Sequence, residues 1–220
     1  MIHPRDLARA LAAPDHLVLA AATLEQGEDH IEALLGVRPQ RGGKHVAMGT
    51  HNSLLRLGER SYLEVIAIDP EGEAPLHPRW FALDTASMRM ALREAPRLIH
   101  WVARTEDIDA ARLACPVDLG PAHPMERGAF RWRITIPDDG HLPGGGVLPT
   151  LIQWADARHP ADAMADSHVR LVTLAGAHPE PAMIRSALAA LGLGDILRVT
   201  YGAQPRLAAM LQTPRGPVSL

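Results

Sequence analysis

The sequence predicts an α+β protein in which a βαβββ unit occurs twice and a shorter unit follows. Three observations support this prediction: apolar runs of strand length, amphipathic segments behind helix-capping residues, and the recurrence of that order along the chain. The first module spans residues 14–70 and the second spans residues 98–157, with a linker and one helix at 71–97. A partial β-α-β-β extension occupies residues 168–220, and all four parts are expected to form one compact domain.

In the first module a buried strand is expected directly after Pro14, and a helix follows it. Thr23 and Gln26 have the spacing of a capping box, and Gly36 supplies a helix stop after residues 24–35. Strands are expected at residues 15–21, 37–40, 53–57 and 61–68.

The second module repeats this order after the helix of the linker. Thr105 is expected to cap a helix that runs to Ala114, with Glu106 and Asp107 in its first turn, where the helix dipole favours acids. The glycine-rich segment 137–146 is expected to be a loop. Strands are expected at residues 98–103, 117–119, 130–136 and 148–155. In the extension, strands are expected at 169–174, 196–201 and 206–212, with a helix at 181–191.

Composition narrows the class of protein. The 220 residues include 22 basic and 25 acidic side chains, and 47% of residues are hydrophobic, which is ordinary for a globular chain. No basic run suits nucleic acid, no apolar run reaches the length of a membrane span, and residues 1–13 are expected to be a short amphipathic piece. The single cysteine, Cys115, excludes a disulfide framework and a cysteine zinc cage. We therefore expect a cytoplasmic protein with a small-molecule partner, no nucleic-acid or membrane partner and no nucleotide cofactor, while a homodimer stays open.

Aligning the two modules brings polar residues into equivalent positions. His16 aligns with His100 on the first strands, and Glu64 aligns with Gln153 on the last strands. A polar side chain within an apolar strand is costly unless a partner satisfies it. If the modules pack around a pseudo-twofold axis, the four side chains converge.

Two imidazoles, one carboxylate and one amide oxygen are a plausible set of ligands for a divalent metal such as Zn, Mn, Ni or Fe(II). Such a set would leave coordination positions open for water or substrate. The alternatives are that His16 is a satisfied core histidine and that Gln153 only forms hydrogen bonds.

Several segments resemble the glyoxalase-like branch of the vicinal oxygen chelate superfamily. They are residues 15–18, 49–58 and 62–66, and residues 144–149 followed by 152–154. The resemblance implies paired modules that form a half-open, cup-shaped mixed sheet around a metal. It also implies ligands on the first and last strands of each module, which match His16, Glu64, His100 and Gln153 in this sequence.

The resemblance is compatible with several reactions, because members of this superfamily catalyse different ones. One difference between this sequence and glyoxalase I affects which reaction is expected. Glyoxalase I carries a glutamate where this chain has Gln153, and an amide cannot abstract a proton, so the role of base would pass to Glu64, bound water or a neighbouring histidine. The leading hypothesis is a metal-dependent enzyme acting on a small oxygenated metabolite, with lyase or isomerase chemistry favoured over dioxygenase chemistry. The alternative is a non-catalytic, drug-sequestering protein of the bleomycin-resistance type.

Three further residues are candidates for contacts with a substrate. His51 could donate to a substrate oxyanion and is a candidate catalytic residue, and Asn52 beside it is a candidate binding residue. Arg133 could clamp an acidic substrate, although a strand arginine more often faces solvent. The segment Gly144–Gly146 is not followed by a helix with the lysine of a phosphate-binding loop. If the segment has a function, we expect it to be a mobile flap over the cup.

Overall fold

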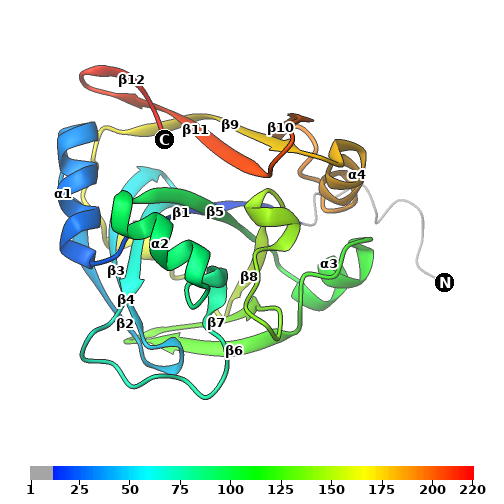
Figure 1. Cartoon of the computed structure of the whole chain (residues 1–220), viewed down its shortest axis with the longest axis horizontal. Helices are drawn as coiled ribbons and strands as arrows, with labels where there is room; N and C mark the ends of the chain where they lie inside the picture. Colours follow the sequence, from blue (N-terminus) through cyan, green and yellow to red (C-terminus); the bar gives the residue numbers. More distant parts are fainter. Residues whose placement is uncertain (1–11) are drawn as a thin grey trace.

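The computed structural model describes residues 12–220, so the amphipathic piece expected at residues 1–13 lies outside the described residues except for its last two. An eight-stranded mixed sheet and a separate four-stranded sheet make up the fold (Figure 1). The eight-stranded sheet forms the cup-shaped mixed sheet that the resemblance implied, and it is nearly closed. The fold class is therefore confirmed.

The first βαβββ module forms one half of the large sheet. Its elements are β1 (Ala13–Ala20), α1 (Leu24–Leu35), β2 (Gln40–His45), β3 (Thr50–Gly58) and β4 (Ser61–Ile68). The Thr23 hydroxyl accepts a hydrogen bond from the Gln26 amide at 3.1 Å, and Gly36 ends α1 with a φ of 77° that glycine adopts without strain.

The second module forms the other half. Its elements are β5 (Arg97–Arg104), α3 (Ile108–Ala114), β6 (Ala122–Arg127), β7 (Phe130–Thr135) and β8 (Thr150–Trp154). Asp107, rather than Thr105, caps α3: its side chain accepts the Ala110 amide at 3.0 Å.

Two strand predictions were wrong, and for the same reason. Residues 117–119 form no strand, and β6 lies further along the chain; β2 covers residues 40–45, part of which was expected to be loop. Both β2 and β6 are edge strands in the order β2-β3-β4-β1-β5-β8-β7-β6. Edge strands face solvent on one side and need no apolar pattern, so their sequences carry little strand signal.

A pseudo-twofold axis relates the two modules between β1 and β5. These strands are antiparallel, whereas β1 is parallel to β4 and β5 is parallel to β8. His16 lies opposite Val102 and Val18 lies opposite His100, so the two histidines occupy equivalent positions. At the far ends of the sheet, β2 and β6 approach each other, and Arg127 Nη1 lies 3.3 Å from His45 Nε2.

The C-terminal unit builds the smaller sheet. Its elements are β9 (Arg170–His178), α4 (Pro181–Ala190), β10 (Leu197–Tyr201), β11 (Arg206–Thr213) and β12 (Gly216–Ser219), with the strand order β10-β9-β11-β12. Strand β12 extends the partial unit that the sequence predicted. Figure 1 shows this sheet along one side of the large sheet, with α1 near one end and α4 near the other.

Strand alternation divides most of the core into two clusters, one on each face of the large sheet, and a third, small cluster consists of Leu54, Tyr62 and Met164. Leu17 and Leu19 of β1 pack in the outer cluster, which includes residues of α1, α3, α4 and the small sheet. Val18 and Ala20 pack in the inner cluster, which lies within the cup. The linker covers this inner face with η3 (Trp80–Ala82) and α2 (Ala86–Glu94). No helix in the described part of the chain is long and apolar enough to cross a membrane.

Candidate functional site

A pocket opens on the inner face of the cup. Its cavity volume is about 20 Å³, room for about one water molecule, within a depression whose total empty space, open solvent included, is about 330 Å³. Polar and aromatic side chains from both modules and from η3 line it. They are His16, His45, Tyr62, Glu64, Trp80, Phe81, Arg127, Trp132, Ile134, Ile152 and Trp154.

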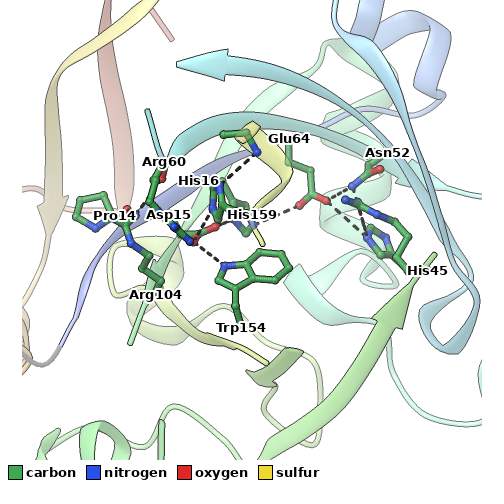
Figure 2. A network of polar contacts seen from close by, with 12 residues as sticks. Pro14, Asp15, His16, His45, Asn52, Arg60, Glu64, Arg104, Trp154 and His159 are labelled. Atoms are coloured by element: carbon green, nitrogen blue, oxygen red, sulfur yellow. Dashed lines mark hydrogen bonds and ion pairs between the residues drawn. The ribbon is translucent and has the colours of Figure 1, made fainter. Parts of the chain in front are cut away.

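A buried carboxylate fixes the orientation and tautomer of His16. His16 Nδ1 lies 2.7 Å from Asp15 Oδ1 and donates to it. The other oxygen of Asp15 accepts from Trp154 Nε1 at 3.0 Å and from His159 Nε2 at 3.2 Å (Figure 2). Since Nδ1 carries the proton, His16 Nε2 is left with a lone pair, the arrangement that a general base or a metal ligand needs.

Asp15 is ionised throughout the ordinary pH range. Burial acts to raise its pKa, but the hydrogen bonds from His159 and His16 outweigh burial and hold the pKa far below its usual value. His159 Nδ1 accepts the Ala161 amide at 3.2 Å, so its proton lies on Nε2, the nitrogen that faces Asp15. The carboxylate charge is therefore shared among three N–H donors.

Glu64 faces the free nitrogen of His16 across the pocket. The distance from Glu64 Oε2 to His16 Nε2 is 3.7 Å, and Glu64 is only 5% exposed. Asn52 donates from Nδ2 to Glu64 Oε1 at 2.5 Å, which holds the carboxylate in place (Figure 2). His16 and Glu64 thus form a pair of groups that can accept or donate a proton. Asp15 holds His16 in place, and Asn52 holds Glu64.

His45 continues this row of polar groups toward the seam of the cup. Its Nε2 lies 3.9 Å from Glu64 Oε1 and 3.3 Å from Arg127 Nη1, and its Nδ1 lies 3.2 Å from Thr50 Oγ1. Burial lowers the pKa of His45 to about 4, so the ring is neutral at pH 7. We infer that Nδ1 carries the proton and that Nε2 accepts from the guanidinium.

Aromatic rings enclose these polar groups. Tyr62 stacks on His16 with ring centroids 4.6 Å apart, and Trp80 and Trp132 meet His45 edge-on at 5.0 and 6.2 Å. Phe81, stacked on Trp80, has a φ of 59°, a left-handed conformation that is unusual for a bulky residue. Such strained residues are frequent at ligand sites.

His100 also lies on the inner face, but both of its nitrogens are committed to the backbone. Nδ1 donates to the Gly146 carbonyl at 3.3 Å, and Nε2 accepts the Thr150 amide at 3.0 Å. The Thr150 hydroxyl lies 2.9 Å from the same Nε2. Burial lowers the pKa of His100 to about 3. No lone pair of this ring is therefore free for a metal.

Gln153 does not join the cluster, because the sequence alignment of the last strands was out of register. Glu64 lies opposite Val18 on β1, and Thr150 lies opposite the equivalent Val102 on β5. Thr150 is therefore the counterpart of Glu64. Gln153 lies three residues further on, and an odd shift in a strand reverses the face.

The side chain of Gln153 supports the start of α3 instead. Its Oε1 accepts the Ile108 amide at 3.2 Å, and its Nε2 donates to the Glu106 carbonyl at 2.7 Å. This role matches the alternative of a glutamine that only forms hydrogen bonds.

Of the further candidates, Asn52 lies in the cluster, whereas His51 and Arg133 lie on the outer face. His51 lines a different pocket, beside the start of α1, with its Nδ1 4.0 Å from Asp69 Oδ1. Arg133 forms an ion pair with Asp109 at 2.7 Å. The segment Gly144–Gly146 is buried in part against β5, where Gly146 binds His100, so it is a structural support for the site rather than a free flap.

The predicted set of four metal ligands therefore does not fit the structure. Only His16 Nε2 and the Glu64 carboxylate meet, and Asn52 and Arg127 place N–H groups beside Glu64 and His45. Residues 12–220 contain no group of three or more His, Cys, Asp or Glu side chains arranged to hold a metal ion. Two donors would leave most of the coordination sphere of a metal to water or substrate.

Sequence reasoning missed the aromatic residues that line the pocket and four acidic, basic or histidine residues of the site: Asp15, His45, Arg127 and His159. Asp15 directly precedes His16, and an acid beside a histidine was a readable signal. His45 and Arg127 end the two edge strands whose sequences carry no strand pattern, and His159 lies in a loop beyond β8. Nothing local in the sequence connects these three residues to His16.

Three comparisons with known proteins show what this chain is similar to. The chain is similar to a hypothetical protein from Staphylococcus aureus, with 15% identity, a TM-score of 0.59 and coverage of 88% of this chain and 87% of that one. A methylmalonyl-CoA epimerase from Mycobacterium tuberculosis gives 21% identity, a TM-score of 0.43 and coverage of 68% and 93%. The comparison with curated proteins finds no match. The family model described as a glyoxalase-like domain matches residues 15–192, and the chain belongs to that family.

Proposed function

We propose that this protein is an enzyme of the isomerase or lyase type that moves a proton on a small oxygenated molecule bound in the cup. The observation that carries this proposal is the row Asp15–His16–Glu64, in which a buried carboxylate orients an imidazole toward a second carboxylate. Hydrogen-bonded pairs of this kind make histidine an effective general base at neutral pH. Membership of the glyoxalase-like family is consistent with such chemistry but does not specify it.

The proposed step is the removal of a proton from a carbon beside a carbonyl group. His16 Nε2 takes the proton, the C–H electron pair moves to form an enolate, and the negative charge moves to the carbonyl oxygen. Asp15 stabilises the imidazolium that results. Return of the proton from His16 to the same or a neighbouring atom, directly or after its transfer to Glu64, completes an isomerisation, whereas departure of a leaving group with its electron pair from the enolate completes a lyase reaction.

If the protein binds a divalent metal, His16 and Glu64 are the two predicted ligands that could hold it. A bound metal would supply Lewis-acid stabilisation of a substrate oxygen. Glu64 provides the only anionic ligand of the predicted set, so Glu64→Ala should abolish metal retention and His16→Ala should weaken it strongly. Since His100 and Gln153 are engaged elsewhere, His100→Asn and Gln153→Ala should bind Zn, Mn, Ni or Fe(II) as the parent does.

Solvent exchange of carbon-bound hydrogen tests the proposed step directly. We would incubate the protein in D₂O with pyruvate, phenylpyruvate or dihydroxyacetone and follow loss of the C–H signal by NMR, with and without each added metal. His16→Asn and Glu64→Gln should lower the exchange rate about 10²- to 10⁴-fold. Arg133→Gln, on the outer face, is the matched control and should exchange as the parent does.

The second candidate function is the non-catalytic binding protein of the bleomycin-resistance type. One observation favours it. Both ring nitrogens of His100 are engaged in hydrogen bonds, so this position of the second module offers neither a metal ligand nor a general base. Binding of these probes without exchange, unaffected by His16→Asn and Glu64→Gln, would support this function and contradict the enzymatic one.

A further inference from the structure

Three hydrogen-bond donors of the pocket have no anionic partner among the described residues, and two of them have no acceptor at all. They are the guanidinium of Arg127 and the indole N–H groups of Trp80 and Trp132. All three side chains surround His45, at the end of the pocket away from Asp15. Their common feature is that each can donate to an anionic oxygen.

Arg127 is a cation without a carboxylate partner within ion-pair distance in the described chain. Within residues 12–220 its single hydrogen-bond contact is with His45 Nε2, and its guanidinium also lies 6.0 Å from the ring centroid of Phe130. A neutral imidazole orients the guanidinium without neutralising its charge. Arginines of the neighbouring strand differ, because Arg131 pairs with Glu126 at 2.8 Å and Arg133 pairs with Asp109.

The indole N–H groups of Trp80 and Trp132 are a second, independent observation that points to a missing acceptor. Trp80 and Trp132 are 3% and 6% exposed, and the Nε1 atom of each is buried with no hydrogen-bond partner in the described structure. A buried donor without an acceptor costs free energy, so such groups in a folded protein call for an explanation. A ligand oxygen that enters the pocket would supply the missing acceptor.

The polar groups of the pocket are ordered along one row. His16 and Glu64 lie 3.7 Å apart, Glu64 and His45 lie 3.9 Å apart, and His45 and Arg127 lie 3.3 Å apart. The lone pair of His16 is thus at one end, and the unpaired positive charge is at the other. A molecule bound across this row would place an anionic group at Arg127 and a C–H bond near His16.

We propose that Arg127, with the indole N–H groups of Trp80 and Trp132, binds a carboxylate group of the substrate. This inference rests on the proposed function and narrows its substrate class to small carboxylic acids. A carboxylate suits these donors because guanidinium groups bind it through charge-assisted, often bidentate hydrogen bonds. The aromatic walls suit a small apolar remainder, for which the side chains that line the pocket must move apart.

Binding of matched acids and esters tests the inference without requiring turnover. We would measure affinities of phenylpyruvate, mandelate and their methyl esters for the full chain by isothermal titration calorimetry. The parent should prefer each acid over its ester. Arg127→Gln should weaken binding of the acids about 10- to 100-fold and leave the esters unchanged, and Arg127→Lys should recover part of the preference.

Two further variants and a control complete the test. Trp80→Phe and Trp132→Phe remove one N–H each and keep an aromatic wall, so each should weaken acid binding several-fold. Arg133→Gln should bind like the parent. A parent with no preference for the acids, including one that binds neither form, would overturn the inference, as would an unchanged preference in Arg127→Gln.

Failure of this inference differs from failure of the proposed function. If acid binding depends on Arg127 but His16→Asn leaves deuterium exchange unchanged, the substrate-binding role stands and the catalytic role of His16 is wrong. If exchange depends on His16 but acids and esters bind alike, the catalytic role stands and the carboxylate-binding role is wrong.

Discussion

The two halves of the cup hold equivalent histidines that do different things. In the first half, His16 is oriented by Asp15 and faces Glu64 with a free nitrogen. In the second half, His100 is tied to backbone groups of Gly146 and Thr150. The same strand positions therefore provide a reactive group on one side of the axis and a structural hydrogen-bond hub on the other.

Two substitutions across the axis account for this difference. Ile99 precedes His100, where Asp15 precedes His16, so the second imidazole has no carboxylate to orient it. Thr150 stands where the first half has Glu64, and its short side chain brings a hydroxyl to 2.9 Å from the ring. A pseudo-symmetric fold thus keeps one site and uses the other position for stability.

The largest effect is expected from removing the charge that orients His16. Asp15→Asn replaces an acceptor for three N–H groups by an amide that carries two donors of its own. Because breaking a buried charged network is strongly destabilising, we expect a loss of about 3–5 kcal/mol in the free energy of unfolding. Urea denaturation at pH 7 would measure it, and a loss below about 1 kcal/mol would show that the network does not hold the first half together.

The free energy of unfolding, measured as a function of pH, tests the buried, neutral state of His100 in the second half. Burial lowers the pKa of His100 from its ordinary 6.5 to about 3. Below pH 6.5 the unfolded chain binds a proton that the folded chain does not, so stability falls as the pH falls toward 3. By pH 5 this one group should cost about 2 kcal/mol.

The control for that titration is His100→Asn, which removes the titrating group. The variant is expected to be less stable at pH 7 but to lose about 2 kcal/mol less than the parent between pH 7 and pH 5. His45, whose pKa burial lowers to about 4, contributes a similar loss to parent and variant alike. Parallel stability curves for the two proteins would contradict the buried, neutral state of His100.

A smaller effect is expected from the residue that replaces Glu64 in the second half. Thr150→Ala removes the hydroxyl beside His100 Nε2 and keeps the backbone amide that donates to that nitrogen. The expected loss of stability is about 1–2 kcal/mol, measured by thermal or urea unfolding. Deuterium exchange on the probes should be unchanged, and a large loss of exchange would show that the second half takes part in the chemistry.

The smallest effect is expected from Gln153, which the repeat alignment had placed among the ligands. Gln153→Ala removes two hydrogen bonds to the start of α3 and should cost about 1 kcal/mol of stability. Metal binding and exchange should match the parent. Loss of either would restore Gln153 to the site and contradict the register described above.

The sequence by itself determined the α+β class, and it indicated two modules and the candidates His16 and Glu64. These follow from local patterns: buried strands have apolar runs, helices have caps, and a polar residue within an apolar run is conspicuous. Asp15 was readable as well, because it directly precedes His16.

Only the tertiary structure decided which groups meet. The register of β8 places Thr150 rather than Gln153 on the inner face. Since β8 has apolar residues on both faces, its sequence pattern does not show which residues face inward. Closure of the cup brought His45 and Arg127 together from the two edge strands, far apart in sequence and without an apolar pattern. The hydrogen bonds that occupy His100 come from backbone atoms, and the positions of backbone atoms depend on the fold rather than on residue type.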